Sequence, residues 1–218
     1  MKRQVSMEEI SDGKLYTLND MVKAGCGDCK GCSACCQGMG NSIILDPLDV
    51  HRITVHLEKG FEQLLEEEKI ELQVVDGIIL PNLMMCGKEE RCAFLNAEGR
   101  CAIHAFRPGI CRLFPLGRLY EEGSFRYFLQ IHECKNQNRT KVKVRKWIDT
   151  PEAGRYEQFI IDWHNFLADI QERLAKETDQ AEVKRTNMLI LQRFFVTAFE
   201  PESDFYRQFN ERITGMED

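Results

Sequence analysis

The chain has 218 residues, and its hydrophobic (43%) and charged (29%) fractions are those of an ordinary soluble globular protein. Its formal net charge of −6 argues against a general phosphate-backbone binder, whose surface would be basic. The start of the chain lacks the apolar stretch of a secretory signal, and no run reaches the ~18–20 apolar residues of a membrane span. We therefore expect a cytoplasmic protein without a nucleic-acid or membrane partner.

Ten cysteines stand out against this ordinary composition, and five of them lie within residues 26–36. Thiols stay reduced in the cytoplasm, so the cysteine count indicates metal ligation and not a disulfide framework. If the chain were exported, five disulfides would be the competing account.

The first half of the chain predicts short elements around the cysteines. Residues 1–24 form a polar lead-in, with a short helix expected near 17–25. Asp46 can cap a helix whose first residue is Pro47, and a second short helix is expected over 61–69. Asp76-Gly77 and Glu122-Gly123 each lie between β-branched or aromatic runs, which predicts two hairpins.

The second half changes in character from residue 151. Apolar residues at helical spacing predict helices over 157–177, 183–200 and 203–215. The basic stretch 139–146 is interpreted as a solvated strand or helix face. The predicted fold is α+β, with a loop-rich cysteine-cluster domain over 25–150 and a helical extension over 151–218 packed on it.

The first cysteine segment fits two ligand spacings. One is C-x2-C-x2-C-x3-C, the spacing of bacterial ferredoxin clusters, although Gln37 replaces the usual proline. The other is C-x2-C-x2-C-C, which ends on the adjacent pair Cys35 and Cys36. Adjacent side chains tend to point apart, which favours two neighbouring metal sites or one cluster with thiolates on different metal atoms.

The second cysteine segment is more widely spaced. Its gaps are long for a zinc ribbon, whose ligands come in tight pairs, and they suit a loop that wraps around a site. Arg112 follows Cys111 directly and is a candidate to offset the negative charge of thiolate ligands at a cofactor. His104 and His132 lie close to cysteines and stay open as further ligands.

The stretches "CKGCSACC" and "CAFLNAEGRCAIHAFRPGICRLFP" resemble the YkgJ family, the CxxCxxCC zinc- or iron-chelating domain of bacteria and archaea. The family pattern falls on Cys29, Cys32, Cys35, Cys36, Cys92, Cys101, the R-P-x-x-C-R-x-F-P motif at 107–115 with Cys111, and a last cysteine at Cys134. The resemblance extends to the cysteine-rich part of flagellin lysine methylases and implies an iron–sulfur cluster or zinc. Cys26 and Cys86 lie outside the family pattern.

We expect a metal-binding protein whose two cysteine segments converge on one or two thiolate sites. The predicted ligands are Cys29, Cys32, Cys35, Cys36, Cys86, Cys92, Cys101, Cys111 and Cys134. The first hypothesis is an iron–sulfur cluster, such as 4Fe–4S, in electron transfer or in a radical or methyl-transfer enzyme. The alternatives are structural zinc, with the helical tail as a surface for a protein partner, and metal handling. No catalytic triad, P-loop or dinucleotide motif is found.

Overall fold

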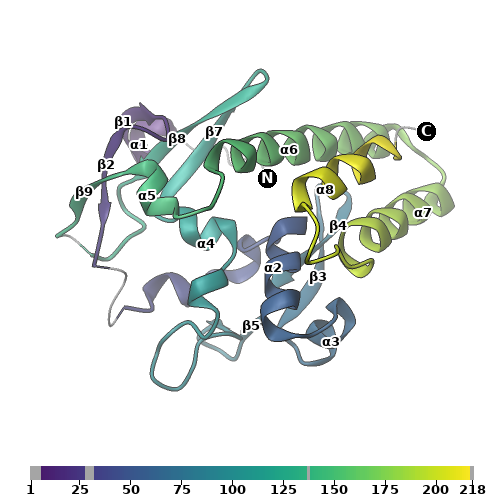
Figure 1. Cartoon of the computed structure of the whole chain (residues 1–218), viewed down its shortest axis with the longest axis horizontal. Helices are drawn as coiled ribbons and strands as arrows, with labels where there is room; N and C mark the ends of the chain where they lie inside the picture. Colours follow the sequence, from purple (N-terminus) through teal and green to yellow (C-terminus); the bar gives the residue numbers. More distant parts are fainter. Residues whose placement is uncertain (1–5, 28–31, 137, 217–218) are drawn as a thin grey trace.

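A computed structural model of the chain describes residues 6–27, 32–136 and 138–216. Small antiparallel sheets and short helices make up the first two thirds of this part, and longer helices make up the last third (Figure 1). The α+β class predicted from the sequence is confirmed. Within these residues, no helix has both the length and the apolar character that crossing a membrane requires.

The N-terminal residues belong to two sheets. After helix α1 (Met7–Ile10), strand β1 (Ser11–Tyr16) pairs with β8 (Ser124–Gln130), which in turn pairs with β7 (Leu116–Glu121). Strand β2 (Met21–Gly25) pairs with β9 (Thr140–Lys143). The short helix expected near 17–25 is therefore wrong. Val22 and Ala24 are buried while Met21 and Lys23 are exposed, and this alternation is that of a strand.

The predicted helix after Asp46 is confirmed as α2 (Pro47–Leu57), and its cap has both halves of a capping box. The Asp46 side chain accepts a hydrogen bond from the Asp49 amide, and the Asp49 side chain accepts one from the Asp46 amide. Helix α3 (Phe61–Glu66) follows and ends earlier than the predicted range 61–69, since Glu68 takes a left-handed φ of 52°.

Both predicted hairpins are confirmed. Strands β3 (Ile70–Val75) and β4 (Ile78–Leu83) pair in continuous register. Their turn residues, Asp76 and Gly77, both have positive φ, as a two-residue turn matched to the twist of the strands requires. The second hairpin joins β7 to β8 through a turn containing Gly123.

Short elements carry the cysteine segments between these larger units. They are the 3₁₀ helices η1 (Ala34–Cys36), η2 (Gly40–Ser42) and η3 (His104–Phe106), the strand pair β5 (Met85–Cys86) and β6 (Arg91–Cys92), and the helices α4 (Gly109–Leu113) and α5 (Val144–Ile148). Strand β9 and helix α5 contain residues 140–146 of the basic stretch, in which Lys141, Lys143, Arg145 and Lys146 are exposed, as a solvated face requires. Arg139, which precedes β9, is instead half-buried.

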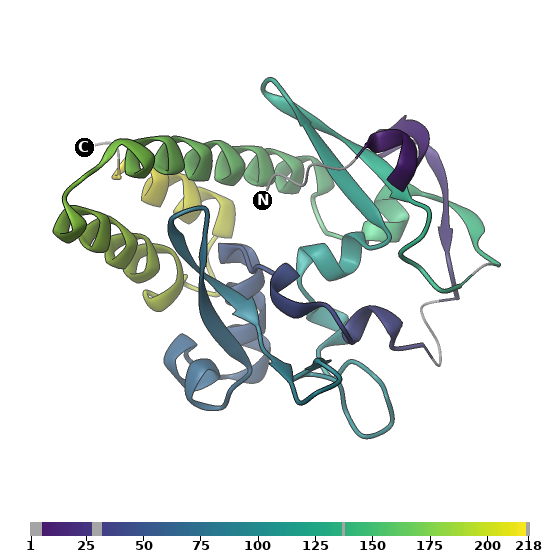
Figure 2. The ribbon, with the colours of Figure 1, turned by 180° about the vertical axis from the view of Figure 1, so that it is seen from behind.

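The C-terminal part contains three helices, as predicted. Helix α6 (Ala153–Lys176) is the longest, α7 (Gln180–Leu191) continues into a π-helical turn η4 (Gln192–Val196), and α8 (Phe205–Thr214) lies beside α6 (Figure 1). They meet in an aromatic cluster that includes Phe159, Trp163, Phe194 and Phe209. Seen from behind, the β3–β4 hairpin lies across the helical part (Figure 2).

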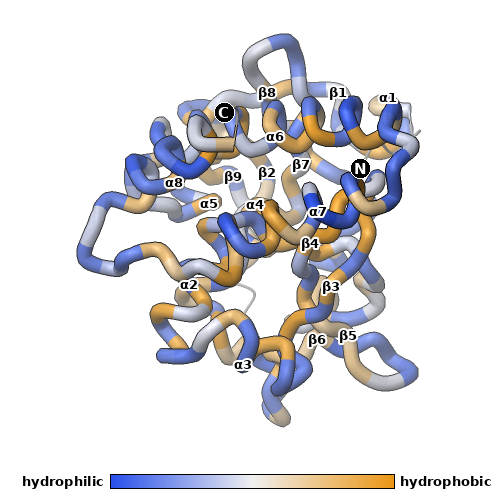
Figure 3. The backbone as a smooth tube through the Cα atoms, turned by 90° about the vertical axis from the view of Figure 1, so that its right-hand side faces the viewer, coloured by the Kyte–Doolittle hydropathy of each residue, from blue (hydrophilic) through white to orange (hydrophobic). Residues whose placement is uncertain are grey.

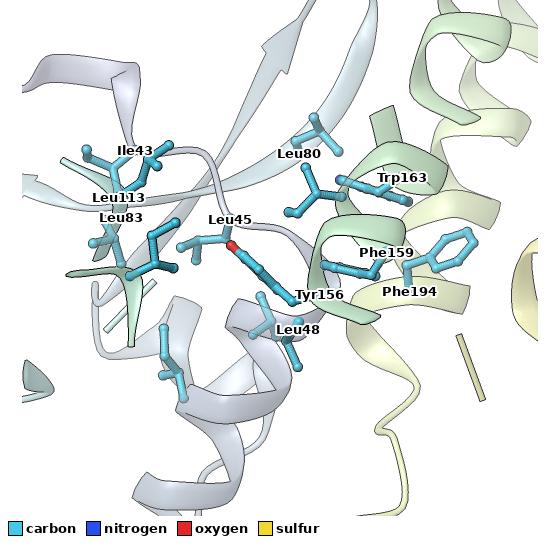
Figure 4. Close-up of a cluster of buried hydrophobic side chains, with 14 of the residues drawn as sticks. Ile43, Leu45, Leu48, Leu80, Leu83, Leu113, Tyr156, Phe159, Trp163 and Phe194 are labelled. Atoms are coloured by element: carbon cyan, nitrogen blue, oxygen red, sulfur yellow. The ribbon is translucent and has the colours of Figure 1, made fainter. Parts of the chain in front are cut away.

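The hydrophobic core runs without a break from the cysteine-rich part into the helices. Tyr156 and Phe159 of α6 lie close to Leu45 and Leu48, which flank the start of α2 (Figure 4). Most of the polar residues lie on the outer loops and outer helix faces (Figure 3). Asn187 of α7 adds a polar link, since it accepts a hydrogen bond from the Ile79 amide at 2.6 Å and donates to the Gly77 carbonyl at 3.1 Å.

Candidate metal centre

A cavity of about 1100 Å³ lies where the cysteine segments meet. Seven described cysteines line it, namely Cys26, Cys32, Cys35, Cys36, Cys92, Cys101 and Cys111. The fold therefore brings together side chains separated by up to about eighty residues in the sequence. Among the described residues, cysteines of both segments line this one cavity, as the predicted convergence requires.

The first segment is held against the turn between β5 and β6. The Cys36 amide donates to the Ser33 carbonyl at 2.9 Å, which closes η1. Gln37 then forms a β-bridge to Arg91, and the Gly38 amide donates to the Glu90 carbonyl at 3.1 Å. These backbone contacts hold the segment that follows Cys36 against Glu90 and Arg91. Since Arg91 directly precedes Cys92, they bring Cys36 close to Cys92.

The second segment forms a tight loop that returns on itself. Leu95 and Cys101 form a β-bridge, and the Ala102 amide donates to the Phe94 carbonyl at 2.8 Å. Between them, the Asn96 amide donates to the Arg100 carbonyl at 2.9 Å. The long spacing between Cys92 and Cys101 is thus used to bring the two thiols to one cavity.

Cys111 reaches the same cavity from α4, and this helix is anchored to the core. The Gly109 amide donates to the buried Asp49 carboxylate at 2.7 Å. Trp147 of α5 donates from Nε1 to the carbonyls of Leu113 and Phe114, at 3.2 Å each. The cap of α2 and the ring of Trp147 therefore set the position of Cys111.

The cavity thiols influence one another's ionisation. The pKa of Cys35 falls to about 7, first because the Cys36 thiol donates a hydrogen bond to it and also because Arg107 lies nearby. That same hydrogen bond, followed by burial, raises the pKa of Cys36. Burial raises the pKa of Cys92, Cys101 and Cys111, and the charges of the neighbouring thiols raise these pKa values further. A bound cation would allow several of them to ionise together.

Arginines surround the thiols on the α4 side. Arg107 donates to the His104 carbonyl at 2.8 Å, and its charge favours thiolates at Cys35 and Cys101. Arg112 is only 7% exposed and donates to three backbone carbonyls, those of Ala105, Arg107 (3.1 Å) and Asp149 (3.0 Å). The guanidinium of Arg112 thereby ties the loop before Cys111 to the end of α5.

The predicted ligands differ in where they lie. Cys29 falls outside the described residues. Cys86 is exposed and Cys134 is half-buried, and neither lines the cavity, although the charge of Cys86 acts on Cys92. Cys26, left open by the sequence, does line it. Their roles as ligands, and the role of Arg112 at a cofactor, stay predictions.

His104 lines the cavity and His132 does not. Among the described residues, no three His, Cys, Asp or Glu side chains are already spaced to hold one metal ion. The donor set still fits a thiophilic metal, since seven cysteine sulfurs and cationic side chains share one cavity. The residues present therefore suit zinc or an iron–sulfur cluster and not a hard cation such as Mg²⁺, which prefers oxygen ligands.

Sequence reasoning did not identify Asp49 and Trp147 as residues that position the site. The D-P-L-D pattern at 46–49 indicates a helix cap, but it gives no sign that the Asp49 carboxylate also accepts from Gly109, sixty residues on. Trp147 carries no sequence signal for its contact with α4.

A comparison with known families gives the same assignment as the cysteine pattern. The family described as "CxxCxxCC: Putative zinc- or iron-chelating domain" matches residues 28–146, which is more than half of the chain. The chain belongs to this family. The match includes the second cysteine segment and all of the first except Cys26. It ends in α5, so the three C-terminal helices lie outside it. The predicted family is thus confirmed, and with it metal binding in general; no curated protein and no solved structure matches the chain.

Proposed function

We propose that the protein holds an iron–sulfur cluster in the cysteine-lined cavity and uses it for electron transfer, either alone or as a component of an enzyme. The observation that carries this proposal is the excess of thiols over the four that a structural zinc ion needs. Seven described cysteines line the cavity, and the family match adds Cys29 in the same segment.

The openness of the site supports the same proposal. Structural zinc sites are closed by four protein ligands, whereas a working centre keeps room beside it. The cavity of about 1100 Å³ has apolar walls as well as thiols, with Ile43, Met85, Phe128 and Trp147 among the lining residues. Apolar surroundings limit the access of water to a thiolate-bound centre and thereby tune its potential.

The charged side chains suit a cluster with several thiolate ligands. A bound cluster would supply one-electron redox chemistry. Arg107 offsets the charge of Cys35 and Cys101, and Arg112 keeps the loop before Cys111 in place through its three carbonyl contacts. These arginines would hold the thiolates together in both oxidation states.

The test is anaerobic purification followed by visible absorption and by assays for iron and acid-labile sulfide. We expect a brown protein with charge-transfer bands that bleach on reduction. Cys35→Ser and Cys101→Ser should lose the chromophore. Cys134→Ser is the comparison: Cys134 is a predicted ligand that does not line the cavity, so a cluster held in the cavity should keep its chromophore in this variant. A colourless protein with stoichiometric zinc would refute the proposal.

A second candidate, structural zinc, is favoured by one specific observation. Cys92 is buried in the hydrophobic core, and Cys36, Cys101 and Cys111 pack against that core. These four thiols would suit a structural zinc ion with four protein ligands. In that case the function would reside in the helical tail as a surface for a protein partner. Zinc that resists chelators in the folded protein, with unfolding when it is finally removed, would support this candidate over the cluster.

A further inference from the structure

A second cavity, of about 480 Å³, lies where α2, η3 and the turn after α5 meet. The side chains that matter for its chemistry are Arg52, His56, Phe106, Arg112, Arg145 and Asp149. None of the described cysteines lines it, although Arg112 and Asp149 also line the thiol cavity, so the two cavities are neighbours. Its volume falls in the range of about 300–1000 Å³ that is usual for small-molecule sites.

The charge of this cavity is opposite to that of the whole chain. The described residues that line it include three arginines and one carboxylic acid, Asp149, which gives a formal excess of two positive charges from these groups. The chain as a whole carries −6. Neither Arg52 nor Arg145 makes an ion pair within 4.0 Å to any residue that the structure describes. Arginines that gather at one cavity without ion-pair partners favour a multiply charged anion.

The two carboxylates that interact electrostatically with Arg52 already accept hydrogen bonds from backbone amides. Asp46 and Asp49 both interact electrostatically with Arg52. However, Asp46 accepts from the Asp49 amide, and Asp49 accepts from the amides of Asp46 and Gly109. These oxygens serve the cap of α2 and the anchor of α4, so they do not occupy the guanidinium of Arg52.

Arg112 keeps hydrogen-bond donors at the cavity that lack protein acceptors. The Nη1 atom of Arg52 also has no partner among the described residues, but it is buried away from the open cavity. Arg112 has five N–H groups, and its three bonds to carbonyls leave two of them without a protein acceptor. A buried donor without an acceptor costs free energy, and an oxyanion would satisfy several such donors at once.

An aromatic pair forms another part of the wall. The His56 ring stacks on Phe106, with centroids 4.5 Å apart and planes at 14°. Its Nδ1–H donates to the Arg52 carbonyl at 2.8 Å, which fixes the ring on the helix that carries Arg52. The pair presents a flat apolar surface next to the guanidinium groups, as the organic part of a charged ligand would need.

We propose that this second cavity binds the phosphate group of a small molecule through Arg52, Arg112 and Arg145. Arginine matches phosphate better than any other side chain does, because its planar fork donates two parallel hydrogen bonds to neighbouring oxygens. The excess of two positive charges suits the dianion. The site takes either free inorganic phosphate or a phosphate ester whose organic part lies against His56 and Phe106.

The test is calorimetric titration of the full-length protein, with the metal it carries on purification, with inorganic phosphate at constant ionic strength. Saturable binding is expected for the wild type. Arg145→Met, at an exposed position, should weaken it at least about tenfold, a factor that corresponds to about 1.4 kcal/mol. Arg52→Met should do the same. Arg185→Met is the matched control, since Arg185 is an exposed arginine on α7 that pairs with Glu182.

Three results would overturn the assignment: no saturable phosphate binding by the wild type, equal loss in the Arg185→Met control, or unchanged affinity in both Arg145→Met and Arg52→Met. Unaltered metal content and circular dichroism in the variants separate loss of this site from damage to the thiol cavity. A parallel titration with phenyl phosphate distinguishes the two sources of the group. Tighter binding than inorganic phosphate indicates an ester, and equal or weaker binding indicates the free ion.

Discussion

The carboxylate of Asp49 joins the cap of α2 to the helix that carries Cys111, so its removal tests how the scaffold holds the site. Asp49 is 3% exposed and accepts from the Gly109 amide at 2.7 Å and from the Asp46 amide at 3.3 Å. Asp49→Ala leaves both donors without this acceptor. It should therefore loosen both α2 and α4.

The size of the effect follows from those two bonds. An unpaired buried donor costs about 1–3 kcal/mol, and relief of the buried carboxylate, whose pKa burial raises, offsets part of this. We expect a net loss of about 2–4 kcal/mol in the free energy of unfolding. For a chain of this size, that corresponds to a fall of about 4–16 °C in Tm. Asp49→Asn keeps one acceptor oxygen and should lose about half as much.

Thermal unfolding followed by circular dichroism is the assay, together with metal content after gel filtration. Asp179→Ala is the matched control, because Asp179 caps α7 with one bond, to the Ala181 amide at 2.8 Å, at an exposed position. It should cost about 1 kcal/mol and leave metal content unchanged. If Asp49→Ala melts no earlier than Asp179→Ala and retains its metal, then Asp49 does not anchor the site as argued.

Two further substitutions test contacts around the site, and a third tests the link between α7 and the β3–β4 hairpin. Gly109→Ala would place a methyl group 2.2 Å from the Tyr156 hydroxyl oxygen, so we expect a loss of about 1–3 kcal/mol in urea unfolding; unchanged stability would show that Tyr156 can move aside. Asn187→Ala should cost about 1–3 kcal/mol, because the Ile79 amide loses its acceptor; hydrogen exchange at that amide should rise, and a rate equal to that of wild type would contradict the contact. Arg112→Lys should lower metal retention during dialysis, since one ammonium cannot reach three carbonyls, and retention as in wild type would remove Arg112 from this role.

Local sequence signals predicted the longer helices and the two hairpins, but not the short elements that carry the cysteines. The Asp46-Pro47 cap, the two Gly-containing hairpin turns and the three C-terminal helices are each specified by residues within one short segment. For strand β2 the sequence predicts a helix, and this prediction is wrong. The strand is only five residues long, and the alternation of Val22 and Ala24 is too short to identify it without its partner β9.

The candidate site was likewise predictable only in part. Its residue types and its two segments could be read from the sequence, because thiolate chemistry requires cysteines and their spacing is unusual. The sequence could not show which of the cysteines line the cavity. Cys26 lines the cavity while Cys86 and Cys134 do not. This depends on the pairing of β2 and β8 with the distant strands β9 and β1, and on the local pairing of β5 with β6.

The amino-acid sequence by itself determined the family, the α+β class and the expectation of a thiolate metal site, since these depend on residue identity and short-range spacing. Tertiary structure alone decided that Asp49 anchors the helix of Cys111 and that Arg52, Arg112 and Arg145 meet at one cavity. The physical reason is that both arrangements join residues from separate elements. Only packing of the core determines which distant donors and acceptors come within a hydrogen bond of one another.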